Sequence, residues 1–246
     1  MSAHSAAPLF AGMTDSCIRS VLSEWMGDLI CDDPAAPRSA IATVGCFSFL
    51  AGEVNEELLR HLLSRGGFRI LVPKQDSPWA RAIPTLLPHA EAVERYGLDP
   101  HSCFDRAHLI ALTEHLPMGI ALVPIDRALY ARCRNEAFPR VFVENYPTWK
   151  DFEEKGRGVL AMTDDGIVAG CSSFSSCPEG IEIEIATHPD FRRMGLAMAC
   201  GAWMIRSCLD EGRFPFWDAA NPASRALAMK LGYAPTDSYT AYCIDQ

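Results

Sequence analysis

The chain has 246 residues, of which 49% are hydrophobic and 22% are charged, and its formal net charge is −9. This composition is that of an ordinary soluble globular protein with one large domain or two small ones. The negative charge argues against a protein that coats nucleic acid or an anionic membrane. No apolar run reaches the roughly 20 residues that a membrane-spanning helix needs.

Ten cysteines are scattered along the chain, and none forms a CxxC pair. Several stand in apolar segments, where a thiol behaves as a small hydrophobic side chain. The short apolar patch near the N-terminus has no Lys or Arg before it, which makes it a poor signal peptide. We therefore expect a reduced, cytoplasmic protein without a structural metal.

The first half of the chain alternates helical and strand patterns, and its sequence shows no internal repeat. Residues 14–30 have the apolar spacing of a single helix, with Thr14 or Asp15 as its N-cap. Further along, we expect strands at 41–50, 68–73, 91–97 and 119–124, and helices at 54–65, 78–87 and 105–115. Strands that alternate with helices predict an α/β layer arrangement.

A second domain is expected to start near Ile125, so that the two domains comprise residues 1–125 and 126–246. Its expected elements are short helices at 126–135 and 147–155, a hairpin around Asp164-Asp165-Gly166, a strand at 181–187, a helix at 193–210, a short strand in RFPFWDA, a helix from Asn221-Pro222 to Leu231-Gly232 and a last strand SYTAYCI. This order predicts a mixed sheet with helices packed on it, an α+β arrangement.

The segment Arg192-Arg193-Met194-Gly195-Leu196-Ala197 has the features of a phosphate site. A helix N-terminus presents unpaired N–H groups and positive partial charge, and both suit an anion. Gly195 and the small Ala197 allow an anion to approach the backbone closely. The plain alternative is a helix that merely begins with arginine, although basic residues are unfavourable at the positive end of the helix dipole.

Two glutamates interrupt the apolar strand that precedes this helix. Because side chains in a strand alternate between its faces, Glu182 and Glu184 share one face about 7 Å apart, and three isoleucines share the other. A carboxylate in such a place can accept a proton, or it can belong to a solvent-facing side of the strand. Both interpretations stay open, as does the choice between the two glutamates.

The motif R/Q-x-x-G-x-G/A, present here from Arg192 to Ala197, resembles the acetyl-CoA signature of the Gcn5-related N-acetyltransferases, the GNAT superfamily. IEIEIATHPDF resembles the family's fourth strand, and NPASRALAMKLGYAP resembles its second CoA-contacting helix. The chain is similar to a bacterial branch with an extra N-terminal α/β unit. The resemblance implies a GNAT acyl-CoA transferase fold in the C-terminal half, after a smaller α/β domain that shapes or covers the acceptor cleft.

The resemblance also implies which residues contact acetyl-CoA. Main-chain groups of Ile185, Ala186 and Thr187 would pair with the pantetheine arm like an added strand, at a bulge that splays the strand. The pyrophosphate would lie on the amides that follow Arg192, namely those of Arg193, Met194, Gly195, Leu196, Ala197 and Met198. Asn221 and Ser224 would face the cofactor from the next helix, although Asn221 is equally suited to a simple N-cap.

One departure from the family concerns the leaving thiolate. Many GNAT enzymes place a tyrosine four residues before the glycine of the Leu-Gly-aromatic ending, and this chain has Ala228 there. Either the thiolate leaves unaided, since a thiol of pKa about 8.5 is a fair leaving group, or Tyr239 or Tyr242 protonates it. For both tyrosines, a role as core aromatics of the last strand is favoured.

Together these features predict an enzyme that transfers an acetyl group from acetyl-CoA to an amine, with Glu184 or Glu182 as the general base. The acceptor would be a small-molecule or peptide amine that the sequence does not identify, and a homodimer stays open. Two alternatives remain: transfer of another acyl group, and a non-catalytic CoA-binding sensor on a GNAT scaffold, which Ala228 would favour. No metal, nucleic-acid or membrane partner is expected.

Overall fold

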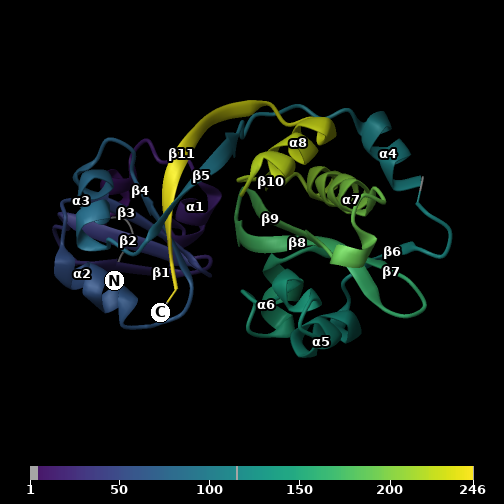
Figure 1. Ribbon diagram of the computed structural model, residues 1–246, viewed down its shortest axis with the longest axis horizontal. Coiled ribbons are helices and arrows are strands. Elements are labelled where there is room, and N and C mark those ends of the chain that lie inside the picture. Colours follow the sequence, from purple (N-terminus) through teal and green to yellow (C-terminus); the bar gives the residue numbers. More distant parts are fainter. Residues whose placement is uncertain (1–4, 115, 246) are drawn as a thin grey trace. The chain divides into compact units, whose positions relative to one another are not determined.

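The computed structural model describes residues 5–114 and 116–245, and the chain divides into two compact units (Figure 1). Unit 1 comprises Met1–Arg95 and Ser238–Gln246, and unit 2 comprises Tyr96–Asp237. The boundary that we expected between residues 125 and 126 lies inside unit 2. The reason is that helix α4 (Arg106–Glu114) packs against helix α7 (Leu196–Asp210), so the segment after residue 95 belongs with the second half of the chain.

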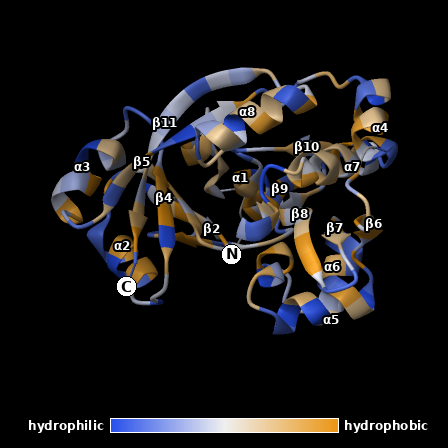
Figure 2. Cartoon of the chain, turned by 45° about the vertical axis from the view of Figure 1, so that its right-hand side comes forward, coloured by the Kyte–Doolittle hydropathy of each residue, from blue (hydrophilic) through white to orange (hydrophobic). Residues whose placement is uncertain are grey.

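Unit 1 is built around a mixed sheet whose strands β2 and β3 are mostly buried. Its elements are η2 (Ala7–Phe10), α1 (Ser16–Leu22), β1 (Asp28–Cys31), β2 (Ser39–Val44), β3 (Phe47–Gly52), α2 (Glu56–Leu63), β4 (Arg69–Pro73), α3 (Pro78–Leu86) and β5 (Glu91–Leu98). Helix α2 carries hydrophobic and hydrophilic residues, orange and blue in Figure 2. It buries Leu59 and Leu62 in a core with Ile41, Leu50 and Leu71 of the sheet.

Two predictions in unit 1 are wrong. The helix expected over 14–30 ends at Leu22, and β1 follows, because Gly27 turns the chain back onto β2. A Cβ at Gly27 would lie 2.3 Å from the Thr43 carbonyl oxygen. The strand expected over 41–50 is a hairpin of β2 and β3, whose turn contains Gly45 at φ 55. The expected cap of α1 is confirmed: Asp15 accepts a hydrogen bond from the Cys17 amide at 2.7 Å.

Unit 2 contains the predicted mixed sheet, in the order β10-β9-β8-β7-β6, with β9 and β10 parallel and the other pairs antiparallel. Its further elements are β6 (Ala121–Pro124), α5 (Arg127–Asn135), η3 (Pro139–Phe142), α6 (Trp149–Lys155), β7 (Gly158–Met162), β8 (Ile167–Cys177), β9 (Gly180–Thr187), η4 (Pro189–Phe191), β10 (Phe214–Phe216) and α8 (Pro222–Leu231). Helices α7 and α8 lie on one side of β8 and β9, and α5 and α6 lie on the other (Figure 1).

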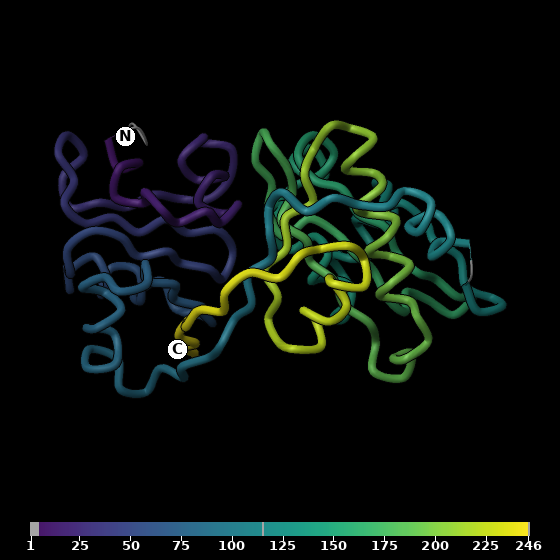
Figure 3. The backbone as a smooth tube through the Cα atoms, turned by 90° about the horizontal axis from the view of Figure 1, so that it is seen from above, coloured from purple at the N-terminus to yellow at the C-terminus, as the bar shows by residue number. Residues whose placement is uncertain are grey.

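We had expected the last strand, β11 (Pro235–Ile244), to belong to the sheet of unit 2, and this prediction is wrong. It lies between β4 and β5 in the sheet of unit 1, where Tyr242 pairs antiparallel with Leu71. The chain therefore passes between the units twice, near residue 95 and near residue 237, and both passages can be followed by colour in Figure 3.

The two units repeat one arrangement of elements, although the sequence shows no repeat. The order β1-β2-β3-α2-β4-α3-β5 corresponds to β7-β8-β9-α7-β10-α8-β11. In both series the first three strands are antiparallel neighbours, and the fourth pairs parallel with the third. Helices α2 and α7 consequently have equivalent places, each as the first α-helix after the third strand of its series.

Candidate functional site

Strand β9 offers a backbone edge that extends past its neighbour. Strand β10 runs beside the first three residues of β9 only, from Gly180 to Glu182. On the other side, β8 pairs with β9 as far as Thr187. The predicted residues Ile185, Ala186 and Thr187 therefore lie on a strand that is held along one edge and runs beyond β10 on the other. Such an edge suits an extended ligand that carries amide groups.

The loop after β9 curls before helix α7 begins. We had expected the helix to start near Arg193, but it starts at Leu196. The reason is that Arg193 at φ 65 and Gly195 at φ 80 adopt left-handed conformations, which a right-handed helix cannot contain. Met194 lies between them and has a negative φ. This alternation in the sign of φ is the pattern found in anion-binding nests, in which successive N–H groups point toward one place.

The start of α7 is open in a way that fits a phosphate. No side chain caps this helix, and its first turn contains no acidic residue. Arg192 and Arg193 are exposed just before it. A Cβ placed at Gly195 would meet no atom of the chain within 4 Å, so the protein itself does not fill the space beside this turn. Unpaired amides, positive partial charge and two arginines thus meet at one place.

The two glutamates face away from α7. Ile181 and Ile183 pack into the core beneath α7, so by strand alternation Glu182 and Glu184 point to the other face, where η3 lies over β8 and β9. Glu182 is only 9% exposed, and its Oε1 accepts a hydrogen bond from the Asp218 amide at 2.7 Å. Glu184 is half-buried. The two carboxylates therefore have different surroundings.

Three cysteines lie in the core beside this strand as protonated thiols. Burial, with smaller contributions from neighbouring thiols and Glu184, raises the pKa of Cys171 well above its ordinary value. Burial likewise raises the pKa of Cys200 and of Cys208 to about 12. A thiol acts as a nucleophile only as thiolate, so none of the three is suited to carry an acyl group.

The bulge lies in β8 and not in β9, where we had expected it. The pairing of β8 with β9 shifts between Ser173 and Ser175, which leaves Phe174 outside the ladder, opposite the start of β9. The Phe174 carbonyl accepts a hydrogen bond from the Asn145 side chain at 2.9 Å. This contact satisfies the carbonyl of the extra residue, which the ladder between β8 and β9 does not pair.

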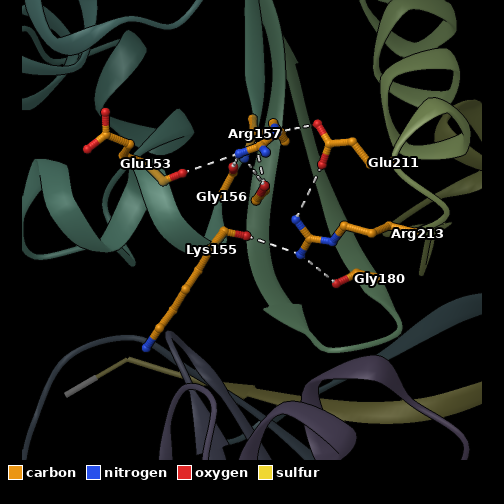
Figure 4. Close-up of polar contacts among 8 residues, drawn as sticks. Glu153, Lys155, Gly156, Arg157, Gly180, Glu211 and Arg213 are labelled. Carbon is orange, nitrogen blue, oxygen red and sulfur yellow. Dashed lines mark hydrogen bonds and ion pairs between the residues drawn. The ribbon is translucent and has the colours of Figure 1, made fainter.

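A group of charged residues fixes the start of β9 and the end of α7 (Figure 4). Arg157 donates to Glu211 at 2.6 Å, and the Arg213 guanidinium lies 4.0 Å from the same carboxylate. Arg213 also donates to the carbonyl oxygens of Lys155 and Gly180. These bonds tie α6, β9 and the C-terminal end of α7 together, at the end of the helix remote from Gly195.

Helix α8 begins with the predicted cap and packs against α7. Asn221 Oδ1 accepts a hydrogen bond from the Ser224 amide at 2.9 Å. The Ser224 hydroxyl accepts one from Trp217 Nε1 at 3.1 Å. Both polar groups therefore have roles within the fold, whatever else they contact. Ala228 is fully buried.

The two tyrosines proposed as proton donors lie outside unit 2. Tyr239 and Tyr242 are on the part of β11 that belongs to unit 1. Tyr242 packs against the core of that unit, which agrees with the favoured interpretation of a core aromatic. In unit 2, the buried Tyr233 hydroxyl donates to the Pro215 carbonyl oxygen at 2.6 Å.

Sequence reasoning missed two contributors to the site. Asp218 supplies a backbone amide to Glu182, and a backbone contact leaves no signature in the identity of the residue. Helix α4 was assigned to the other domain, yet Arg106 pairs with Asp210 of α7 at 2.6 Å, and His108 Nε2 lies 3.1 Å from the Lys230 carbonyl oxygen of α8. Helix α4 therefore braces both helices whose N-termini carry predicted cofactor residues.

Within the described residues, no group of three or more His, Cys, Asp and Glu side chains is arranged to hold a metal ion. In the same part of the chain, every helix is too short or too polar to cross a membrane. All ten cysteines are free thiols.

Known proteins are similar to this chain in sequence or in fold. A protein from Streptococcus suis, titled a GCN5-related N-acetyltransferase-like protein, has 36% identity and a TM-score of 0.92, over 98% of this chain and 97% of that one. A GCN5-related N-acetyltransferase from Sphaerobacter thermophilus, with 14% identity, a TM-score of 0.59 and coverage of 100% and 95%, shares the fold alone.

The uncharacterized N-acetyltransferase YdfB of Bacillus subtilis (strain 168) is 32% identical over 135 residues, which are 53% of this chain. The match spans 50% of YdfB, about half of that protein's length. A model of the GNAT acetyltransferase family matches residues 7–242, which include both units. The chain belongs to the GNAT acetyltransferase family.

Proposed function

We propose that this protein transfers an acetyl group from acetyl-CoA to an amine, in the cytoplasm. One observation carries the proposal. The edge of β9 that extends past β10 is followed, after a short loop, by the uncapped start of α7 with its alternating φ angles. A strand edge next to an anion site matches acetyl-CoA, whose pantetheine arm bears amides and whose other end bears a pyrophosphate.

The residues present fit this ligand. The pyrophosphate would lie on the amides from Arg193 to Met198, with Arg192 beside them. The arm would lie along the edge of β9 at Ile185–Thr187, and Asn221 and Ser224 would face it from α8. The space beside Gly195 and the lack of a side-chain cap on α7 support this assignment.

Acetyl-CoA supplies an activated thioester, whose carbonyl carbon an amine can attack. In the transfer, the new C–N bond forms as the C–S bond breaks, the amine proton goes to a carboxylate of β9, and the CoA thiolate leaves. We propose direct transfer, because the buried thiols of Cys171, Cys200 and Cys208 stay protonated. With Ala228 buried and the Tyr233 hydroxyl donating to Pro215, we propose that the thiolate leaves without a protein acid.

The test is a two-step measurement on the full-length protein. Acetyl-CoA at millimolar concentration should raise the thermal midpoint, because a ligand that binds only the native state stabilises it. A library of amines should then be screened for thiol release from acetyl-CoA. No thermal shift would overturn the cofactor assignment. Binding without any responding amine would favour the CoA sensor, and release from another acyl-CoA alone would favour a different donor.

We also propose that unit 1 shapes the acceptor cleft, as the sequence resemblance implies, and a homodimeric state stays open. A comparison of acceptor preference among surface variants of unit 1 would test the first, and sedimentation of the pure protein would test the second.

A further inference from the structure

We propose that the two glutamates of β9 have separate roles. Glu182 is a positioning residue that ends the pairing of β9 with β10 and keeps the edge from Ile183 to Thr187 available, whereas Glu184 takes the proton. This inference rests on the proposed function, because the edge that Glu182 preserves is the one assigned to the pantetheine arm.

The register of the two strands indicates what Glu182 does. Phe216, the last residue of β10, lies beside Glu182. If the pairing continued in this register, Asp218 would lie beside Glu184, and its amide would seek a main-chain acceptor on β9. Instead the Asp218 amide donates to the Glu182 carboxylate at 2.7 Å. The side chain thus replaces the next main-chain acceptor of the ladder.

The energetics favour this interpretation. A buried amide without a partner costs about 1–3 kcal/mol, so two parallel strands separate only where something satisfies the groups at the fork. A charged acceptor makes a hydrogen bond roughly twice as strong as a neutral one. Without Glu182, the Asp218 amide could regain a partner by pairing further along β9, and that pairing would cover part of the edge.

The same surroundings make Glu182 a poor proton acceptor for an incoming amine. Glu182 is 9% exposed and lies between Ser175 of β8 and Phe216 of β10. One of its carboxylate oxygens already accepts a hydrogen bond from the Asp218 amide. Glu184 lies two residues further along the same face, past the end of β10, and is half-buried. Of the two carboxylates, Glu184 is the one next to the edge Ile185–Thr187, which we propose holds the arm of acetyl-CoA.

Acetyl-CoA binding by calorimetry separates the roles without an acceptor. We expect Glu182→Ala to weaken binding at least about tenfold, the factor that corresponds to about 1.4 kcal/mol. Glu182→Gln should stay within about threefold of the wild type, because its amide oxygen can accept from Asp218. If Glu182→Ala does not fold, Glu182→Met fills the same volume without an acceptor and should weaken binding similarly. Glu184→Gln should bind normally.

With an amine found in the screen, the pH dependence of the rate completes the test. Glu182→Gln should keep the limb on which the rate rises with pH, and Glu184→Gln should lose it. Normal acetyl-CoA binding by Glu182→Ala or Glu182→Met, or loss of the limb in Glu182→Gln, would overturn the proposal. If the wild type itself does not bind acetyl-CoA, the proposed function fails first, which is a distinguishable result.

Discussion

Helices α2 and α7 have equivalent places in the two units, but their N-termini differ in capping and in charge. In α2, the Asn55 side chain accepts hydrogen bonds from the amides of Glu57 and Leu58, and the first turn carries Glu56 and Glu57. In α7, the N-cap is Gly195, which has no side chain, and the first turn has no acid. The positive end of α2 is thus satisfied by its own residues, whereas that of α7 has neither a side-chain cap nor an acidic residue, which is why we propose an anion site there.

The strands and turns before these helices differ in the same sense. Gly52 and Gly195 both have a positive φ, but a Cβ at Gly52 would lie 2.1 Å from the Arg38 carbonyl oxygen, and one at Gly195 would meet nothing within 4 Å. Strand β4 pairs with β3 from Phe47 to Leu50, most of that strand, whereas β10 pairs with less than half of β9. One repeated arrangement therefore yields a closed copy in unit 1 and an open copy in unit 2. We propose that the open copy holds acetyl-CoA, and we call it the binding copy.

The largest effect should follow the loss of a feature that only β9 has. Strand β3 reads FSFLAG and carries no carboxylate, whereas β9 carries two. We expect Glu184→Gln to lower turnover about 100- to 10,000-fold, the range for loss of a general base. Steady-state thiol release measures the rate, and calorimetry should show unchanged acetyl-CoA affinity. A turnover equal to that of the wild type would place the base elsewhere.

A substitution at the N-cap of α7 should block the proposed acetyl-CoA site of the binding copy. Gly195→Val forces a β-branched residue into a left-handed conformation and places a side chain beside the nest, so affinity for acetyl-CoA should fall about 100-fold. Gly212, just past the other end of α7, has φ 70 and equally open surroundings. Gly212→Val should lower the thermal midpoint to a similar degree and leave affinity unchanged. Equal losses of affinity in both variants would contradict the assignment.

The acidic first turn of α2 can be transferred to α7. Ala197 occupies the position that Glu57 has in α2, the second residue of the helix. Ala197→Glu should lower acetyl-CoA affinity about tenfold or more through repulsion of the pyrophosphate, yet leave stability unchanged or raise it by about 0.3–1 kcal/mol through the helix dipole. Calorimetry and thermal unfolding of one preparation give both quantities. A parallel fall of affinity and stability would indicate misfolding instead.

The smallest effect is expected from a substitution in the closed copy, at the N-cap of α2. Asn55→Ala removes the cap of α2 and should cost about 1 kcal/mol, which lowers the thermal midpoint by about 2–4 °C for a chain of this length. Acetyl-CoA affinity should not change, because α2 holds no ligand in this account. Any weakening of acetyl-CoA binding would show that the two copies are less independent in function than their N-termini suggest.

Features encoded by neighbouring residues could be predicted from the sequence. The segment from Arg192 to Ala197, the Asn221 cap and the Gly232 helix end each depend on a few adjacent residues, and the structure has the corresponding turn and caps. The mixed sheet of unit 2 followed from the order of such segments.

The errors depend on residues distant in sequence. The end of α1 depends on the approach of Gly27 to Thr43, and the burial of Glu182 is accompanied by a hydrogen bond from the distant Asp218 amide. The destination of β11 is decided by β4, far earlier in the chain. A local pattern contains no information about such partners, so the end of the helix expected over 14–30 and the extent of unit 2 could not be derived from it, and the sequence left the choice between Glu182 and Glu184 open.

The central claim is that the chain has one acetyl-CoA site, at α7, and none at α2. Calorimetric titration of the full-length protein with acetyl-CoA tests it most directly. We predict one molecule per chain, with binding weakened by Ala197→Glu and unchanged by Glu57→Ala. Two molecules per chain, no binding, or a loss caused by Glu57→Ala and not by Ala197→Glu would contradict the account.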